Sequence, residues 1–258
     1  MITVSDILQT LCAWAPPETA MDFDNVGLLC GRKGNEVNRV LVSLDITKDV
    51  VFEAIEGQFD LIITHHPLIW KGSLNAVTDD SSTGDLILTL ARYRISVICM
   101  HTNLDIAENG VNDCLARALG LQAVEILPGT DNCVRTGILD IPMEEEAFVR
   151  FVKDTLGCDG VRYMPSGHSI YKVAVGGGSC GDYTEAAVEA ECDAFVTADI
   201  KYAKMLYAKE ADITLIDAGH FCTEDVICPA IVSTLSEAYS TVTFMKSKRH
   251  GEFIRFLK

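Results

Sequence analysis

The sequence lacks the features that mark several large classes of protein. No apolar run approaches the roughly 20 residues that a membrane-spanning helix needs, and the first residues carry no basic segment typical of a secretory signal. Positive charge is scarce: 21 Lys and Arg residues stand against 37 Asp and Glu, a formal net charge of −16. These absences predict a cytoplasmic chain without membrane contact. They also argue against binding to DNA or RNA, which requires a basic surface.

Cysteine pairs with metal-binding or redox spacing are absent as well. The chain has 10 cysteines, but it contains no C-x-x-C pair. A disulfide framework is not expected in a reducing cytoplasm, and a zinc site built from thiolates has no support in this spacing. We therefore expect most of the cysteines to be small buried apolar residues.

Apolar residues make up 48% of the chain and charged residues 22%, which is the balance of a folded globular protein. Strand-like and helix-like segments alternate. Asp60–Thr64 and Ile95–Met100 are typical of buried strands, and a helix is predicted between them at Gly84–Tyr93. This alternation predicts βαβ units, and hence an α/β fold with mainly parallel sheets.

The first helix and the division into lobes can also be predicted. Met1–Trp14 has the periodicity of an amphipathic helix, and Thr3 with Asp6 resembles a capping box. Pro, Gly, Asp and Asn cluster at Leu127–Asn132, and the alternation of strands and helices resumes after this break. We predict two α/β lobes, residues 1–127 and 128–258, whose final segments either stay with the second lobe or return to the first.

Four of the six histidines lie in three short polar segments, each directly after a predicted strand. The first segment carries His65 and His66, the second (a predicted loop) His101 and Asp105, and the third His220 and Glu224 one helical turn apart. Ligands of an open α/β sheet bind beyond the carboxyl ends of its strands. The other histidines, His168 and His250, lie in polar turns and are expected to be exposed to solvent.

Three imidazoles and two carboxylates are too many ligands for one tetrahedral zinc ion with an open position. His65, His66, Asp105, His220 and Glu224 suit two divalent ions bridged by a carboxylate and a water. Glu224 is the expected bridge, because its two oxygens can hold both ions. These ligand types accept Zn, Fe, Mn or Ni, so the identity of the metal stays open.

His101 is then expected to transfer a proton, to support the ligands or to face the substrate.

Other motifs allow two interpretations each. Asp24 either lines the site or closes a turn, and Asp45 either supports the ligands or belongs to a helix cap. The glycines at 176–178 either cradle a phosphate or form a simple turn. Lys201 either attracts an anionic substrate or lies on a solvated helix face.

Taken together, the motifs resemble the Nif-three-like family of dinuclear-metal hexameric proteins, whose bacterial members are often labelled GTP cyclohydrolase I type 2 homologues. The resemblance covers almost the whole chain. It is carried by Asp24-Asn25-Val26-Gly27-Leu28 with Gly31, Ser43-Leu44-Asp45-Ile46-Thr47, Ile63-Thr64-His65-His66-Pro67, His101-Thr102-Asn103-Leu104-Asp105, Asp199-Ile200-Lys201-Tyr202 and Gly219-His220-Phe221-Cys222-Thr223-Glu224.

The resemblance implies two α/β lobes, the Nif-three-like fold, and a toroidal homohexamer with its metal sites facing an internal cavity. It also implies two divalent metal ions per chain. One ion is bound by His65 and His220, the other by His66 and Asp105, and Glu224 bridges them.

One position departs from the family pattern. Ala203 stands where many members carry a histidine, which puts in doubt a proton-transfer or substrate-contact role for the segment around Lys201.

Two functions follow from the resemblance. The first is a metal-dependent hydrolase, in which a metal-activated water attacks a nucleotide or similar small molecule, GTP according to the family label. The alternative is a non-enzymatic protein that binds or delivers metal ions or responds to them, for which the acidic surplus would concentrate cations. Assaying the metal-loaded protein against GTP, phosphoesters and peptides separates the two.

Overall fold

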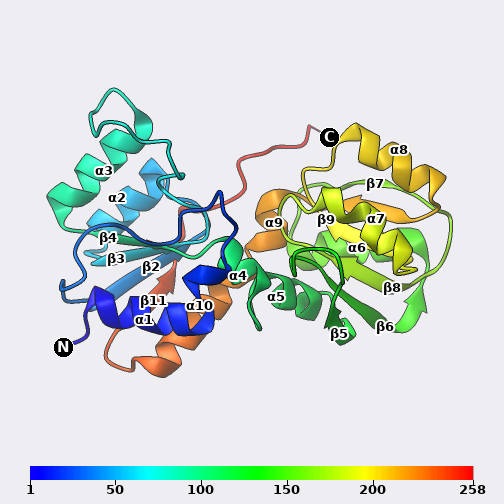
Figure 1. The fold of residues 1–258 in the computed structure, drawn as a ribbon, viewed down its shortest axis with the longest axis horizontal. Coiled ribbons are helices and arrows are strands. Elements are labelled where there is room, and N and C mark those ends of the chain that lie inside the picture. Colours follow the sequence, from blue (N-terminus) through cyan, green and yellow to red (C-terminus); the bar gives the residue numbers. More distant parts are fainter. Residues whose placement is uncertain (258) are drawn as a thin grey trace. The chain divides into compact units, whose positions relative to one another are not determined.

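The computed structural model describes residues 1–257 and divides the chain into two compact units (Figure 1). Unit 1 consists of residues 1–107 and 228–251, and unit 2 of residues 108–227 and 252–257. The predicted boundary at 127/128 must therefore be moved to 107/108. The turn-forming residues that suggested it connect two antiparallel strands inside unit 2. Most of the final segments return to the first unit, which is one of the two arrangements that we considered.

Unit 1 is built on a five-stranded sheet with the order β1-β4-β3-β2-β11. Its strands are β1 (Gly27–Cys30), β2 (Arg39–Ser43), β3 (Leu61–Thr64), β4 (Ser96–Cys99) and β11 (Thr243–Lys246). Its helices are α1 (Val4–Trp14), α2 (Lys48–Glu56), α3 (Ser82–Tyr93), α4 (Thr102–Ile106) and α10 (Ile227–Ala238), with a 3-10 turn at Pro17–Thr19. Only β1 pairs antiparallel, so the prediction of a mainly parallel sheet is confirmed here.

Helices cover both faces of this sheet: α2 and α3 lie on one face, and α1 and α10 on the other (Figure 1). Strand β3 is buried along its whole length, as its mainly apolar sequence predicts. The capping box of α1 is confirmed, because the backbone N–H of Thr3 donates to the Asp6 carboxylate and the backbone N–H of Asp6 donates to the hydroxyl oxygen of Thr3.

Unit 2 is built on a six-stranded sheet with the order β5-β6-β8-β9-β10-β7. Its strands are β5 (Gln122–Ile126), β6 (Arg135–Met143), β7 (Arg162–Met164), β8 (Ile170–Val175), β9 (Ala194–Thr197) and β10 (Thr214–Asp217). Its helices are α5 (Val111–Ala118), α6 (Glu145–Leu156), α7 (Thr184–Glu189), α8 (Tyr202–Glu210) and α9 (His220–Glu224), with a 3-10 turn at Gly181–Tyr183.

The α/β fold is confirmed for this unit, but the expected mainly parallel arrangement is wrong. Only β8, β9 and β10 are parallel, whereas β5, β6 and β7 join the sheet by antiparallel pairings. Strands β5 and β7 have little signal in the sequence. They are short, and β5 is exposed along its whole length, so neither carries the apolar run of a buried strand.

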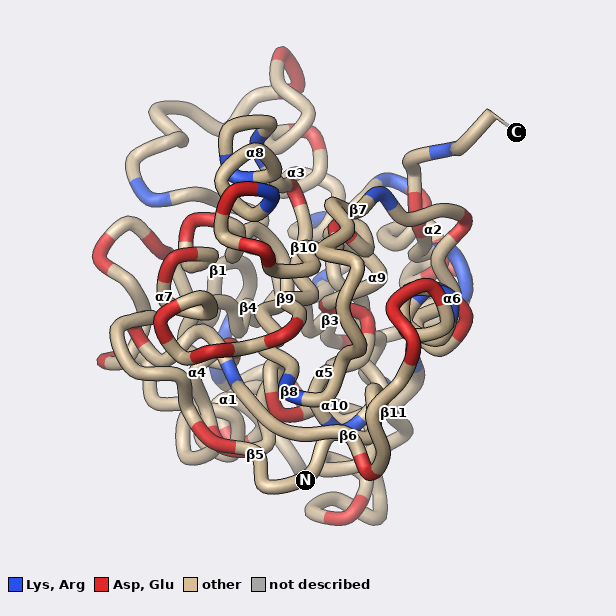
Figure 2. The backbone as a smooth tube through the Cα atoms, turned by 90° about the vertical axis from the view of Figure 1, so that its right-hand side faces the viewer, with Lys and Arg blue, Asp and Glu red and all other residues tan. Residues whose placement is uncertain are grey.

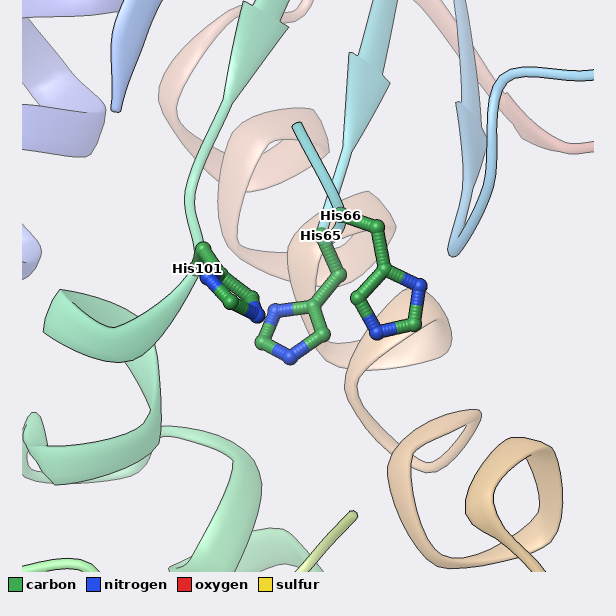
Figure 3. A group of neighbouring side chains, drawn as sticks. All are labelled: His65, His66 and His101. Carbon is green, nitrogen blue, oxygen red and sulfur yellow. The ribbon is translucent and has the colours of Figure 1, made fainter. Parts of the chain in front are cut away.

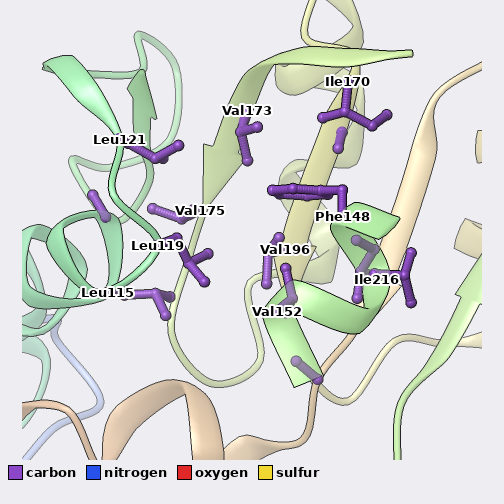
Figure 4. Packing of buried hydrophobic residues seen from close by; sticks show 14 of the residues in the cluster. Leu115, Leu119, Leu121, Phe148, Val152, Ile170, Val173, Val175, Val196 and Ile216 are labelled. Carbon is purple, nitrogen blue, oxygen red and sulfur yellow. The ribbon is translucent and has the colours of Figure 1, made fainter. Parts of the chain in front are cut away.

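The core of unit 2 fixes the ends of the parallel strands. Phe148 and Val152 of α6 pack toward Val173 of β8 and Ile216 of β10, and Leu115 of α5 belongs to the same cluster (Figure 4). These side chains are fully buried. Their packing holds β8, β9 and β10 in register, and so positions the loops that follow these strands.

The surface of the chain is acidic, with Asp and Glu spread over many loops and helix ends (Figure 2). Within residues 1–257, no helix is both long and apolar enough to cross a membrane. Seven of the ten cysteines are buried, which agrees with the structural role predicted for most of them.

Candidate metal centre

Unit 1 brings three of the predicted histidines together at one edge of its sheet. Strands β3 and β4 are parallel neighbours with Thr64 opposite Cys99, so they end at the same level. His65 and His66 follow β3, and His101 follows β4 (Figure 3). Each offers one nitrogen, and these three atoms all lie within 4.8 Å of one another. The site therefore lies at the carboxyl edge, as the sequence predicts.

The buried ring of His65 has a defined orientation. Its Nδ1–H donates to the carbonyl oxygen of Met100 at 2.8 Å, which places the lone pair of the neutral ring on Nε2. That Nε2 lies 3.4 Å from Oδ1 of Asp105. Two electron-rich atoms facing each other in a buried position need a proton or a metal cation to stabilise them.

Asp105 lies on a helix and not, as expected, in a loop. The short helix α4 begins directly after His101, and the backbone N–H of Asp105 donates to the carbonyl oxygen of His101. This single turn brings the Asp105 carboxylate to the His65 ring. Five residues suffice for such a helix once its start is anchored, and a pattern that short does not distinguish a helical turn from a loop.

The structure decides between the two interpretations of Asp45. Its Oδ1 accepts a hydrogen bond from Nδ1 of His66 at 2.9 Å. The hydroxyl of Thr47, not Asp45, caps helix α2. Asp45 therefore supports a predicted metal ligand from behind, which is how carboxylates orient ligand histidines in many metal sites.

Asp24 both closes a turn and holds the site. Its Oδ1 accepts the backbone N–H of Asn25, and its Oδ2 accepts Nδ1–H of His101 at 2.9 Å together with the N–H and hydroxyl of Thr102. Burial by itself raises the pKa of Asp24, but the hydrogen bonds from His101 and Thr102 outweigh it and hold the pKa well below its usual value. Asp24 is therefore a carboxylate that fixes the His101 ring.

Unit 2 carries the remaining two predicted ligands on helix α9. His220 and Glu224 are one turn apart, as predicted, with Nε2 of His220 3.1 Å from Oε1 of Glu224. Nδ1–H of His220 donates to Asp199 at 2.6 Å, and Asp199 also accepts the hydroxyl of Ser179. Burial raises the pKa of Asp199, but the hydrogen bonds from His220 and Ser179 lower it further than burial raises it.

Sequence reasoning did not give Asp199 this role. The available signal was its position two residues after the end of β9, close to the segment that carries Lys201. Lys201 itself lies beside Asp182, 3.4 Å away, and Lys204 binds Glu185 at 2.7 Å. These ion pairs favour a solvated helix face over an anion site.

The glycine loop after β8 does not form the phosphate cradle that we considered. Its N–H groups are already used, because Gly176 donates to Val196, Gly177 to Asn112 and Gly178 to Thr223. Gly178 instead makes room for Glu224, one of the predicted ligands. A Cβ at this position would lie 2.1 Å from Oε1 of Glu224.

The remaining histidines differ from each other. His168 is exposed and binds Asp212 at 2.7 Å, as expected of a polar turn. His250 is half-buried, and its Nδ1 accepts the backbone N–H of Leu44 at 3.1 Å, so the prediction of a solvent-exposed residue is wrong for it. His250 is half-buried because the segment after β11 lies next to the end of β2. The polar sequence around His250 does not reveal this long-range contact.

One rule describes the four histidines that follow strands. Every Nδ1–H donates to an oxygen. His65 donates to the carbonyl oxygen of Met100, and His66 donates to the carboxylate of Asp45. His101 donates to Asp24, and His220 donates to Asp199. Each neutral ring therefore carries its lone pair on Nε2, the form in which imidazole binds a metal. Together with Asp105 and Glu224, this set of nitrogen and oxygen donors fits divalent Zn, Fe, Mn or Ni.

Comparison with known proteins agrees with the fold and the motifs. Residues 2–251 match the family model described as Duf34/NIF3 (NGG1p interacting factor 3). A Clostridium acetobutylicum protein named GTP cyclohydrolase 1 type 2 homolog is 33% identical over 230 residues, covering 86% of this chain and 85% of its own. One of the same name from Clostridium perfringens is 30% identical over 261 residues, covering 98% and 99%.

Solved structures show the same fold. The Bacillus cereus protein related to NIF3 superposes with a TM-score of 0.92 at 23% identity and covers 99% of both chains. A hypothetical protein of Staphylococcus aureus superposes with a TM-score of 0.91 at 29% identity, also over 99% of both chains. The family model spans nearly all of the sequence, and curated relatives match along most of their length. The chain therefore belongs to the DUF34/NIF3 family.

Proposed function

We propose that this protein is a metal-dependent hydrolase with a dinuclear centre. The ligands are those predicted from the sequence, His65, His66 and Asp105 of unit 1 with His220 and Glu224 of unit 2. The observation that carries the proposal is the shared orientation of the imidazoles, each with Nδ1–H bound to an oxygen and its lone pair on Nε2. Histidines prepared in this way are typical of metal sites.

The bound ions supply a water molecule of lowered pKa and positive charge to stabilise the oxyanion. The residues of the chain provide the rest. Asp45 and Asp199 fix the rings of His66 and His220 and increase their basicity. Glu224, with two oxygens, is the ligand that can serve both ions. His101 stands beside His65 and His66, where it either moves a proton or joins the ligands.

A nucleotide is the substrate class to test first. The curated relatives carry the name GTP cyclohydrolase 1 type 2 homolog, which points to a purine nucleotide. The alternative function, binding or delivery of metal ions without catalysis, draws on the net charge of −16, which attracts cations to the surface. It predicts tight and exchangeable ions but no turnover.

The test combines metal content with turnover. Protein loaded with Zn²⁺ or Mn²⁺ should contain two ions per chain and should hydrolyse GTP or a member of a phosphoester and peptide panel. Glu224→Ala should contain fewer than two ions, while the control His168→Ala keeps the wild-type content. Two ions in the wild type without turnover of any substrate would favour metal handling. Two tightly bound ions in Glu224→Ala would contradict the bridging role.

We also propose a closed homohexamer as the assembly. The support is the family resemblance together with the acidic charge, which disfavours close association unless apolar or paired surface is buried between the chains.

A further inference from the structure

We propose that Asp217 is a positioning residue for His220. Its carboxylate joins the two loops that carry His220 and its hydrogen-bond partner Asp199, and Arg162 holds that carboxylate in place. This inference rests on the metal binding proposed above, in which His220 is a ligand. It adds a residue that contacts no ion and acts through the orientation of the His220 ring.

The two oxygens of Asp217 bind different loops. Asp217 is the last residue of β10, and its side chain is 9% exposed. Its Oδ1 accepts the backbone N–H of Gly219 at 3.2 Å, directly before His220 at the start of α9. Its Oδ2 accepts the backbone N–H of Ile200 at 3.0 Å, directly after Asp199 in the loop that follows β9. One buried carboxylate therefore fixes the backbone beside both members of the hydrogen-bonded pair.

Asp199 needs this support because its backbone is left-handed. Its φ is 51°, a region that costs energy for residues other than glycine and persists where the surrounding contacts determine it. Before Asp199, the N–H of Ala198 donates to the carbonyl oxygen of Gly178 at 2.9 Å. After it, the N–H of Ile200 is held by the carboxylate at the end of β10. In this conformation Asp199 accepts Nδ1–H of His220 at 2.6 Å.

Arg162 limits rotation of the Asp217 carboxylate. It is the first residue of β7 and lies opposite Asp217 in the antiparallel pairing of β7 with β10. Its Nε and Nη2 donate to Oδ2 of Asp217 at 2.9 and 2.7 Å, and Nη2 also donates to the carbonyl oxygen of Ile200 at 2.6 Å. The guanidinium therefore binds the same loop that the carboxylate binds. All of these groups belong to unit 2.

Asparagine cannot replace Asp217 in this arrangement. An amide offers one acceptor oxygen, whereas the N–H groups of Ile200 and Gly219 bind two separate oxygens. The NH₂ group of the amide would face one of these donors, and that loop would be released. The ring of His220 would then lose part of the orientation that its contact with Asp199 provides.

The experiment measures the Zn²⁺ affinity of the full-length protein by competition with a chromophoric chelator. His220→Ala identifies which ion depends on His220. Asp217→Asn should weaken that same ion by more than about tenfold. The control is Val152→Ala, which removes methyl groups from the core of unit 2 but none of these hydrogen bonds. It should lower the melting temperature and leave the affinity unchanged.

Arg162→Gln is the second variant. The Arg162 side chain is 62% exposed, so this variant should fold even if Asp217→Asn does not. It should weaken the same ion by about two- to fivefold, whereas Arg150→Gln, which breaks an exposed ion pair on α6, should change nothing. A double-mutant cycle tests the route. Adding Asp217→Asn to Asp199→Ala should cost less affinity than adding it to the wild type, because the contact that Asp217 supports is already gone.

Each outcome decides a different statement. Wild-type affinity in both Asp217→Asn and Arg162→Gln overturns the inference and leaves the proposed dinuclear centre standing. An equal loss in Val152→Ala would mean that the effect is general destabilisation, which also overturns the inference. Equal costs of Asp217→Asn with and without Asp199→Ala overturn the route through Asp199. A wild type that binds no ion contradicts the proposed function itself. Circular dichroism melts of all variants separate a lost fold from a lost orientation.

Discussion

Nδ1 of His66 donates a hydrogen bond of 2.9 Å to Oδ1 of Asp45, a residue 21 positions earlier in the chain. The two residues follow neighbouring parallel strands, β3 and β2, whose ends lie side by side. The carboxylate thus holds the ring from behind and leaves Nε2 as the nitrogen that carries the lone pair. This contact links the topology of the sheet to the chemistry of the site.

Replacing Asp45 should weaken metal binding without removing a ligand. We expect Asp45→Ala to lower the affinity for Zn²⁺ by about 10- to 100-fold, because the His66 ring loses its orientation and part of its basicity. Asp45→Asn, whose amide oxygen still accepts Nδ1–H, should lose less. Competition with a chromophoric chelator measures both affinities. Asp49→Asn, an exposed change in the first turn of α2, is the control. Equal affinities in all four proteins would contradict this role of Asp45.

A methyl group at position 178 should displace Glu224. The Cβ of Gly178→Ala would lie 2.1 Å from Oε1 of Glu224, and the backbone φ of 63° strains any residue other than glycine. We expect more than a tenfold loss of affinity for the ion that Glu224 binds. Gly157→Ala is a matched control, since its φ is 68° but its Cβ would meet nothing within 4 Å. If both variants bind metal equally well, steric displacement of Glu224 does not occur.

Cys222 should not be a metal ligand, although it lies between His220 and Glu224. Its side chain is buried in the core of unit 2 with Cys158. We expect Cys222→Ser to keep the full metal content of the wild type. It should lower the free energy of unfolding by about 1–3 kcal/mol, because a hydroxyl replaces a thiol in an apolar core. Elemental analysis and urea unfolding give the two quantities. Loss of an ion from this variant would reveal a sulfur ligand.

The stability of unit 2 should depend on pH through Glu145. The carboxylate accepts the N–H groups of Ser166 and Gly167 and the hydroxyl of Thr214. Burial raises the pKa of Glu145, but these hydrogen bonds lower it below the ordinary value of 4.5. Its stabilisation is therefore present above pH 4.5 and is lost as the pH falls through the lowered pKa of the folded state.

Glu145→Gln tests this dependence. Near pH 7 the variant should be less stable than the wild type by about 0.5–1.5 kcal/mol, because a charged acceptor is lost whose contribution solvent partly screens. The difference should shrink as the pH falls below about 4.5. Urea unfolding across the pH range measures it, and Glu144→Gln, at an exposed neighbouring position, should show no such trend. A difference that grows toward low pH would have the wrong sign for this mechanism.

The assembly should be a closed ring of six chains. Light scattering at low micromolar concentration should give about six times the chain mass of 28.1 kDa. Added salt should screen the repulsion between chains of charge −16 and leave the ring intact. A mass near that of one chain, unchanged by metal or salt, would remove the ring and leave the proposed metal centre untouched.

Local patterns in the sequence were enough to predict much of the fold. The apolar run before His65 predicts a buried strand, and the Thr3–Asp6 spacing predicts the cap of α1, because these features depend on residues within a few positions of each other. The same holds for His220 and Glu224, since a helix places residues four apart on one face. The position of histidines after strands was likewise visible in the sequence.

Only the tertiary structure decided which oxygens stand behind the imidazoles. Asp24 reaches His101 across 77 positions of the chain, and no local period relates the two. The glycine loop shows the same limit, because the side chain of Asn112, 65 positions earlier, takes the N–H of Gly177 that a phosphate was considered to bind. Such pairings follow from the order of strands in a sheet. Strand order depends on packing between distant segments, so spacing along the sequence does not reveal it.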